Sequence, residues 1–236
     1  MMNFERAKRT VGVLGDSKFA KLTQLDVLIC GVGGVGGFAA EHLARSGVGI
    51  MTLVDGDVVD ISNMNRQIAA TDSSLGKFKC DVLKSRFLEI NPDAKINTYN
   101  TFLRTEEDIS ALLDKKFDYV IDAIDDVPVK VELIASCVER GIPLISSMGA
   151  AGKLDISQIK VADISKTTDC PLARVVRRKL RERGISKGVL TVFSTEDSVP
   201  AAVAGEKPGS LSHVVATFGA FCAQCVIGSA VKSQEE

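Results

Sequence analysis

Short runs of apolar and β-branched residues alternate with helical patterns along the chain from residue 25 onward. Continuous apolar runs of this length are typical of strands in a parallel sheet that helices cover on both faces. We therefore expect strands at residues 25–30, 50–54, 95–99, 119–121 and 143–147. Between them, the periodicity predicts helices at residues 35–46, 76–90, 106–113 and 127–139. The pattern indicates an α/β fold with a Rossmann-like, doubly wound and mostly parallel sheet.

The pattern changes after residue 150, where a C-terminal extension begins. A strand is expected at residues 159–161, followed by a polar loop. A strongly basic helix is expected at residues 171–183, which opens with a proline at a favourable first-turn position. A further strand at residues 190–193 leads into residues 194–210, where two prolines and several charges predict a long loop.

The last segment, residues 211–231, is apolar or small almost throughout, and its length approaches that of a membrane span. It contains His213 and Gln224, however, and it has no aromatic belt and no basic flank other than Lys232. We expect a buried helix, in the core or at a subunit interface, and no membrane insertion.

The composition is that of a soluble globular protein: 45% of the 236 residues are hydrophobic, 25% are charged, and the formal net charge is −1. With so little net charge, a nucleic acid would need a local basic patch on which to bind. The first ten residues include no apolar segment of the kind found in a secretory signal. The six cysteines therefore indicate reduced thiols rather than disulfides, and we expect a cytoplasmic protein.

A glycine-rich turn, Gly31-x-Gly33-x-x-Gly36, stands between the first expected strand and the helix after it. In that position glycines allow the backbone to approach a phosphate closely, and the helix N-terminus offers free N–H groups to an anion. Asp55 ends the second strand, where a carboxylate can accept hydrogen bonds from a ribose. The sequence thus predicts a nucleotide site, for which an NAD-dependent dehydrogenase is the default interpretation.

Two observations argue against a dehydrogenase. The two histidines, His42 and His213, stand inside expected helices, where a packing or surface role is more common than catalysis. Cations beside a triphosphate, together with a carboxylate that can hold Mg²⁺, are what nucleotidyl transfer requires. Such cations and carboxylates, with polar amides among them, follow the second strand and a later one: Asn63, Asn65, Arg66, Gln67, Lys79, Asp125 and Asp126.

At this point the chain resembles the ThiF and ubiquitin-activating superfamily of ATP-dependent adenylating enzymes. The resemblance implies one adenylation domain over residues 1–236, with an N-terminal helical arm (1–24), a nucleotide-binding core (25–150) and a substrate-side extension (151–236). The motifs that carry it are Gly31-Val-Gly-Gly-Val-Gly36, Val54-Asp-Gly-Asp57, Ser62-Asn-Met-Asn-Arg-Gln67, Gly76-Lys-Phe-Lys79 and Asp122-Ala-Ile-Asp125-Asp126.

The resemblance also implies roles for individual residues. The glycines would approach the phosphates, and Asp55 would hold the ribose. Arg66, reaching across a homodimer interface as in some members, and Lys79 would contact the triphosphate. Asp125 would hold the Mg²⁺–phosphate assembly, and Arg6 would reach the phosphates from the N-terminal arm. The full set that the resemblance places around ATP is Arg6, Gly31, Gly33, Gly34, Gly36, Asp55, Asp57, Asn63, Asn65, Arg66, Gln67, Lys79, Asp125 and Asp126.

Within that superfamily the chain is most similar to the tRNA threonylcarbamoyladenosine dehydratases. The segments that distinguish this group are Pro171-Leu-Ala-Arg174 and Phe193-Ser-Thr-Glu196, and the likeness extends through Gly149-Ala-Ala-Gly152. It implies that ATP activates the threonyl carboxylate of the modified adenosine beside the anticodon as an acyl-adenylate, which then closes to a cyclic form. It also implies a tRNA partner and a homodimer, and leaves room for a sulfur-transfer partner.

Cys170 departs from the family pattern, because many relatives have Asp directly before this proline, whereas Asp169 is displaced by one residue. As a nucleophile, Cys170 would suit the sulfur-transferring or ubiquitin-type members; as a loop thiol it would have no catalytic role. Both interpretations stay open, so Cys170 is a catalytic candidate beside Arg66, Lys79 and Asp125.

Zinc is the second question that cysteines raise. Relatives that activate sulfur-carrier proteins often hold a structural zinc with two Cys-x-x-Cys pairs. This chain has one such pair, Cys222 and Cys225, and Ala173 stands where a partner of Cys170 would be needed. No structural zinc is therefore expected, which also argues against a sulfur-carrier activator.

Residues 174–187, which include most of the basic helix, concentrate seven cations and one acid, Glu182. A solvated helix face is the usual reason for such a run. In a nearly neutral protein, the same run would also give a phosphate backbone a place to bind. We expect tRNA to contact Arg174, Arg177, Arg178 and Arg181.

Two other functions stay open. One is an adenylating enzyme for a small ubiquitin-like or sulfur-carrier protein, with Cys170 as the acceptor. The other is a nucleotide-binding module with no catalytic activity, which would bind ATP without releasing pyrophosphate.

Overall fold

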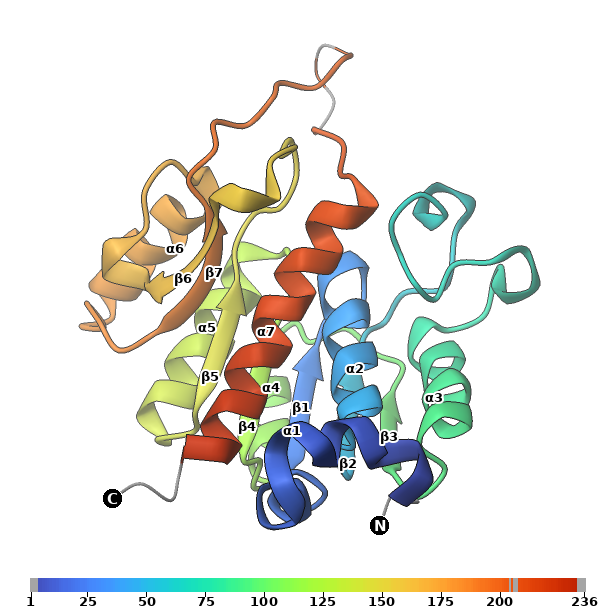
Figure 1. The fold of residues 1–236 in the computed structure, drawn as a ribbon. Helices are drawn as coiled ribbons and strands as arrows, with labels where there is room; N and C mark the ends of the chain where they lie inside the picture. The colour runs from blue at the N-terminus through green and yellow to red at the C-terminus, as the bar shows by residue number, and fades with distance from the viewer. Residues whose placement is uncertain (1–3, 204, 206–207, 233–236) are drawn as a thin grey trace.

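A seven-stranded sheet forms the centre of the fold, in the order β3-β2-β1-β4-β5-β7-β6 (Figure 1). The computed structural model describes residues 4–203, 205 and 208–232, so both ends of the predicted domain lie outside the described residues. Every strand pair is parallel except β6 with β7, which confirms the Rossmann-like, mostly parallel fold. The strands are β1 (Asp26–Cys30), β2 (Ile50–Val54), β3 (Lys95–Tyr99), β4 (Tyr119–Asp122), β5 (Leu144–Ser147), β6 (Ile159–Asp163) and β7 (Leu190–Ser194).

Helices cover both faces of the sheet (Figure 1). One face carries α2 (Gly34–Ser46), α3 (Lys79–Ile90) and α7 (Ser212–Lys232), with α1 (Phe4–Leu22) packed against α2 and α7. The other face carries α4 (Glu106–Leu113), α5 (Val127–Glu139) and α6 (Pro171–Glu182).

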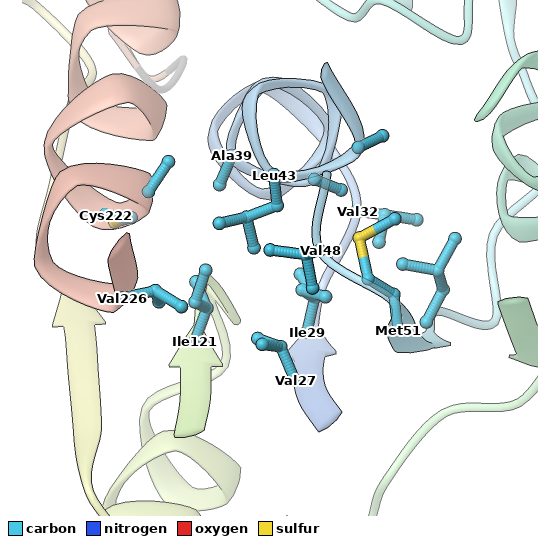
Figure 2. Close-up of a cluster of buried hydrophobic side chains, with 14 of the residues drawn as sticks. Val27, Ile29, Val32, Ala39, Leu43, Val48, Met51, Ile121, Cys222 and Val226 are labelled. Atoms are coloured by element: carbon cyan, nitrogen blue, oxygen red, sulfur yellow. The ribbon is translucent and has the colours of Figure 1, made fainter. Parts of the chain in front are cut away.

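The strands alternate between these two layers, as the pleat of a strand requires. In β1, Val27 and Ile29 belong to the cluster beneath α2 and α7, whereas Leu28 and Cys30 belong to the cluster beneath α4, α5 and α6. Figure 2 shows part of the first cluster, in which side chains from β1, α2 and α7 fill the space between the sheet and the helices. Both faces are thus apolar, which explains the continuous apolar runs in the sequence.

α7 is the long apolar helix that the C-terminal segment predicts. Val214, Phe218, Cys222 and Val226 follow one another at intervals of four residues, and all four are buried in the core. By length and composition alone, α7 would also be able to cross a membrane. Its buried face instead packs against α2 and the sheet (Figure 2).

The start of α3 differs from the prediction, because the helix begins at Lys79 and not at residue 76. Gly76 has a left-handed φ of 75°, and Phe78 has an extended ψ of 133°. Phe78 also forms an isolated antiparallel bridge with Val58. Residues 76–78 are therefore the last part of the excursion, the segment of residues 55–78 between β2 and α3. Their sequence fits the helical pattern, but they do not form a helix.

The strand order reverses at β1, since β2 and β3 lie on one side of it and β4 and β5 on the other. In open α/β sheets the crevice for a ligand lies at such a point, outside the carboxyl ends of the strands. The predicted glycine turn follows β1 and Asp125 follows β4. The topology therefore brings these two parts of the predicted site to one edge.

Candidate active site

A cavity of about 560 Å³ opens at this edge of the sheet. Its volume lies in the range of small-molecule sites. Segments that follow β1, β2, β3, β4 and β5 all contribute to its walls. The predicted site residues that line it are Gly31, Gly33, Gly34, Asp55, Asp57, Arg66, Gln67, Lys79, Asp125 and Asp126. The predicted residues outside its lining are Arg6, Gly36, Asn63, Asn65 and Cys170.

The glycine turn fits an anion because no side chain blocks its backbone. Gly31 has a φ of 81°, and a Cβ there would lie 2.7 Å from the carbonyl oxygen of Ala123. Gly33 caps α2 without a side-chain hydrogen bond, so the first N–H groups of the helix face the cavity without a side-chain acceptor. Gly36 lies beneath the turn, where a Cβ would come within 1.8 Å of the Gly31 oxygen. Gly36 is therefore required for packing beneath the turn, and its approach to the phosphates stays a prediction.

The Asp55 carboxylate is fixed against the glycine turn. Its Oδ2 accepts a hydrogen bond of 2.8 Å from the Val32 N–H, and its Oδ1 accepts one of 2.8 Å from the Asp57 N–H. Phe102, from the segment after β3, packs on Gly56, where a Cβ would lie 2.5 Å from the ring. Carboxylate and ring both line the cavity, and the carboxylate keeps further lone pairs for a sugar hydroxyl.

Lys79 brings a nearly buried ammonium group to the cavity. Its Nζ lies 2.7 Å from Asp57 Oδ2, and its side chain is 5% exposed whereas that of Asp57 is 53% exposed. The backbone N–H of Lys79 also donates to the Asp57 carbonyl at 3.1 Å. Asp57 thus holds Lys79 in place from the solvent side, and the two residues place one anion and one cation side by side in the cavity wall.

Arg66 and Gln67 reach the cavity from the excursion between β2 and α3. Arg66 Nη1 donates to the Ser62 carbonyl at 2.8 Å and to Asn65 Oδ1 at 2.9 Å. Gln67 Oε1 is buried and has no hydrogen-bond partner among the described residues. A buried oxygen without a partner is costly, so a donor on a bound molecule would satisfy it.

Asn63 and Asn65 shape this excursion and do not line the cavity. Asn63 completes a capping box, because its Oδ1 accepts from the Asp60 N–H at 3.2 Å. Asn65 Nδ2 donates to the Ser210 carbonyl at 2.9 Å and so ties the excursion to the segment before α7. Both amides therefore hold the loop that carries Arg66, and their contact with the nucleotide stays a prediction.

Asp125 and Asp126 follow β4 and differ in what they bind. Asp126 caps α5, since its Oδ1 accepts from the Val129 N–H at 3.0 Å. Asp125 is exposed, lines the cavity, and makes no hydrogen bond or ion pair with the rest of the described chain. Asp125 is thus the carboxylate after β4 that is available to a cation.

A buried polar cluster beneath this loop could not be recognised from the sequence. Lys130 Nζ lies 2.7 Å from Asp122 Oδ2 and 3.3 Å from Ser146 Oγ. Asp122 is the first residue of a motif, but a lysine in a helix is normally exposed. The signal that would have found the pair is its position, since Asp122 ends a central strand and Lys130 stands among Val127, Val129 and Val131 in the first half of a mostly apolar helix.

Arg6 lies away from the cavity. Its Nη1 donates to the carbonyl oxygens of Glu89 and Ile90 at 2.7 and 3.1 Å. These carbonyls end α3, whereas Lys79 begins it, and a helix of 12 residues is about 18 Å long. The predicted contact between Arg6 and the phosphates is therefore wrong within one chain, and the cation instead binds the carbonyls at a helix C-terminus.

Cys170 is the cap of α6 and not an exposed nucleophile. Its side chain is 3% exposed, and its Sγ accepts a hydrogen bond of 3.5 Å from the Ala173 N–H. Burial raises the pKa of four other thiols, to about 12 in Cys80 and Cys137. Cys170 is itself buried and its sulfur binds the backbone of α6, so the structure gives no support to its catalytic interpretation.

No cluster of three or more His, Cys, Asp or Glu side chains suited to a metal ion occurs within residues 4–203, 205 and 208–232. Of the one Cys-x-x-Cys pair, Cys222 is fully buried in the core and Cys225 is half-buried on the same helix. A divalent cation at the cavity would therefore need ligands from a bound molecule besides Asp125.

α6 presents three of its four predicted arginines to solvent. Arg174, Arg178 and Arg181 are exposed and follow one another at intervals of four and three residues, so they share one face. Arg177 is different, because its Nη1 donates to the backbone carbonyl and the hydroxyl of Thr167. The prediction for Arg177 is corrected to a structural role.

Comparisons with known proteins agree with this geometry. The profile of the ThiF family matches residues 6–236. The tRNA threonylcarbamoyladenosine dehydratase of Bacillus subtilis is 49% identical over 186 residues, which cover 79% of this chain and 73% of that protein. The crystal structures of the Escherichia coli tRNA N6-threonylcarbamoyladenosine dehydratase with AMP and with ATP superpose with TM-scores of 0.93 and 0.90, at 35% and 34% identity, over 98% of this chain and 95% of theirs.

Proposed function

The chain belongs to the ThiF family, and from this premise we propose that it is an ATP-dependent tRNA threonylcarbamoyladenosine dehydratase. One observation carries the proposal. A cavity at the switch point of the sheet unites a glycine turn, a fixed carboxylate and two cations, and 98% of the chain superposes on a dehydratase whose structures hold AMP and ATP. Those features are what an adenylating enzyme needs, because cations beside a triphosphate stabilise the charge that develops on the departing pyrophosphate.

The bound ATP would extend along the edge of the sheet. Asp55 would accept hydrogen bonds from the ribose, with Phe102 on Gly56 beside it. The N–H groups after Gly33 would bind phosphate oxygens, and the buried Gln67 oxygen would accept a hydrogen bond from the nucleotide. Lys79 and Arg66 would then neutralise charge on the triphosphate.

The chemistry follows from the poor reactivity of a free carboxylate. The threonyl carboxylate attacks the α-phosphorus of ATP, and the bond to pyrophosphate breaks as the acyl–phosphate bond forms. Lys79 and Arg66 stabilise the charge that develops on the departing pyrophosphate. An atom of the same threonylcarbamoyl group then attacks the acyl carbon, and AMP leaves with one former carboxylate oxygen. The net result is the loss of one water from the substrate.

Magnesium is the cofactor that this proposal implies, and the donor set fits it. Asp125 is an exposed carboxylate in the cavity, and Mg²⁺ is commonly held by one or two carboxylates together with substrate phosphates. The ion would supply positive charge between the phosphate oxygens. Asp125 would hold it, while Asp126 stays bound to the backbone of α5.

The proposal extends to partners. The exposed face of Arg174, Arg178 and Arg181 on α6 would bind the tRNA backbone. A homodimer is supported by apolar side chains of the excursion after β2, which are 41–63% exposed: Val58, Ile61, Leu75 and Phe78. A cytoplasmic location and a sulfur-transfer partner stay predictions.

Mass spectrometry of tRNA nucleosides tests the function directly. Threonylcarbamoyladenosine-containing tRNA is incubated with protein, ATP and Mg²⁺, and the nucleoside is expected to become lighter by the mass of one water, with one AMP released. Arg66→Ala should lower the rate by about 10²-fold or more. Arg9→Ala, which removes an exposed arginine of α1 outside the cavity lining, is the matched control and should keep the wild-type rate. A wild-type protein that leaves the nucleoside unchanged would refute the proposal.

The two other functions predict different results. An activator of ubiquitin-like or sulfur-carrier proteins with Cys170 as acceptor would form a covalent adduct that Cys170→Ser loses. The burial of Cys170 and its bond to the Ala173 N–H argue against that adduct. A non-catalytic nucleotide module would bind ATP and release no pyrophosphate with any substrate.

A further inference from the structure

Two sequence motifs that the nucleotide site does not use converge on one turn of the cavity wall. The turn consists of residues 149–152 and follows β5. One motif lies at the start of α6, at residues 171–174. The other ends β7, at residues 193–196. They lie well apart in the sequence, so their common position comes from the fold.

The start of α6 supports the turn from one side. A Cβ built on Gly149 would lie 3.7 Å from Leu172 Cβ and 3.8 Å from Cys170 Sγ, which is ordinary van der Waals distance. Leu172 lines the cavity together with Ala150 and Ala151. The buried Cys170 therefore helps to shape this wall.

Glu196 fastens the turn from the other side. Its carboxylate accepts hydrogen bonds from the N–H groups of Leu154, at 3.0 and 3.1 Å, and of Asp155, at 3.0 Å. Lys153, which is 2% exposed, donates in return to the Glu196 carbonyl. Gly152, with a left-handed φ of 69°, bonds Gly209 and Val199 through its backbone. The backbone just after the turn is thus fixed by one carboxylate.

The position of the turn along the sheet decides what it can touch. The segments after β2 and β1, which bear Asp55 and the glycines, form one end of the cavity. The turn after β5 stands two strands beyond β1, which is about 10 Å at the usual strand spacing. Asp125, after β4, lies between them. Asp55, which is expected to hold the ribose, therefore bounds one end of the cavity, and the turn bounds the other end.

We propose that Ala150, Ala151 and Leu172 form the acceptor wall, the surface that holds the threonylcarbamoyl group, and that Glu196 is its positioning residue. The inference rests on the proposed function and adds the part of the enzyme that selects the amino acid. Two small side chains leave room for the branched threonyl carbons, and Leu172 supplies an apolar contact for the methyl group. One methylene more or less in a hydrophobic pocket changes kcat/KM by about 10- to 200-fold.

The test compares two tRNA substrates that differ only in this group, one with threonylcarbamoyladenosine and one with glycylcarbamoyladenosine. Wild-type protein should prefer the threonyl substrate in kcat/KM. Leu172→Ala should reduce that preference by about tenfold, and Ala151→Val should lower activity on the threonyl substrate more than on the glycyl one. ATP affinity, measured by calorimetry without tRNA, should stay within about twofold in both variants.

Glu196→Gln tests the positioning role, because Oε2 accepts from both N–H groups and Oε1 accepts from Leu154 as well, and the substitution removes the charge and replaces one of these acceptors with an NH₂ donor. We expect a higher KM for tRNA, an unchanged ATP affinity, and more than one AMP released for each cyclised adenosine as water hydrolyses misplaced acyl-adenylate. Asp155→Asn is the matched control, because that carboxylate binds Ser157 and Gln158 and not the turn.

The outcomes separate the two claims. If the wild-type protein does not act on the threonyl substrate, the proposed function fails. If it acts but Leu172→Ala and Ala151→Val keep the wild-type preference between the two substrates, the acceptor wall is refuted and the function stands. If Glu196→Gln changes only the stability, and both its KM for tRNA and its number of AMP molecules released per cyclised adenosine equal those of the wild type, the positioning role of Glu196 is refuted.

Discussion

Lys130 Nζ lies 2.7 Å from Asp122 Oδ2, and both side chains are fully buried beneath the loop that carries Asp125. Ser146 Oγ donates to the same oxygen at 2.5 Å, and Asp122 Oδ1 accepts from the Ile124 N–H at 3.1 Å. A buried ion pair is often no more stable than an apolar pair of the same volume. The Lys130–Asp122 pair instead fixes the backbone after β4, because Asp122 binds Lys130 of α5 and Ser146 of β5.

The first prediction concerns the cost of breaking that pair. Lys130→Met removes the cation and leaves the Asp122 carboxylate buried, so the free energy of unfolding should fall by about 3–5 kcal/mol. Urea denaturation measures the change. Lys115→Met is the control, because its partner Asp26 lies 3.3 Å away and the Lys115 side chain is 43% exposed. That substitution should cost about 1 kcal/mol or less.

A double variant separates charge from packing. Lys130→Met together with Asp122→Leu removes both charges, and it should recover much of the stability that the single variant loses. It should not recover activity, because it lacks the Asp122–Ile124 hydrogen bond that shapes the loop before Asp125. A double variant with wild-type activity would show that the cluster has no part in placing Asp125.

The second prediction is a pH dependence at Glu41 of α2. Glu41 Oε2 lies 2.8 Å from Arg86 Nε, and Oε1 lies 2.6 Å from Arg45 Nη2. Burial by itself raises the pKa of Glu41, but the bonds and charges of Arg86 and Arg45 outweigh it and hold the pKa below its ordinary value of 4.5. Because the folded pKa is the lower one, the group stabilises the fold above pH 4.5, and this contribution disappears as the pH falls through the folded pKa.

The measurement is the free energy of unfolding at several pH values from about 6 to 3. Glu41→Gln should be less stable than the wild type at the upper end, and the two curves should converge as the pH falls. Parallel curves would mean that Glu41 does not titrate with folding. Other carboxylates add the same background to both proteins, so the difference between the curves isolates Glu41.

The third prediction compares two glycines with similar left-handed backbones, Gly31 with a φ of 81° and Gly76 with a φ of 75°. A Cβ at Gly76 meets nothing within 4 Å, so Gly76→Ala should cost only the left-handed penalty of about 1–2 kcal/mol. Gly31→Ala adds a clash with the Ala123 backbone and should cost more. It should also abolish ATP binding by calorimetry, whereas Gly76→Ala should keep it. Equal reductions in ATP affinity in both variants would contradict the role of the glycine turn in binding the phosphates.

Elements and site residues that depend on short-range pattern were predictable from the sequence. The strands and helices of the core follow from apolar periodicity, and α4 and α5 have the expected bounds. Asp55 and Lys79 were predictable for a related reason. Asp55 directly follows an expected strand and Lys79 stands near the start of the expected helix at 76–90, and in a parallel sheet such positions meet at one edge.

Residues whose role depends on tertiary packing were not predictable. Arg6 and Arg177 look like free cations in the sequence, yet each binds backbone carbonyls of another segment. Lys130 looks like a surface lysine, because its partners Asp122 and Ser146 come from strands that pair only in the fold. Periodicity also placed the start of α3 three residues too early, because it carries no information about the positive φ of Gly76.

The last prediction separates tRNA binding from stability on α6. Removing one cation that binds a phosphate should reduce the slope of log K against log salt by about 0.7–0.9. The double variant Arg178→Ala, Arg181→Ala should therefore bind tRNA more weakly and lower the slope by about 1.5. Arg177→Ala should reduce the free energy of unfolding by about 1.5–3 kcal/mol, because it removes the hydrogen bonds to Thr167, and it should keep the slope. Filter binding from low to moderate salt measures the slopes, with Arg9→Ala as the charge control. An unchanged slope in the double variant would exclude this face of α6 as the tRNA surface.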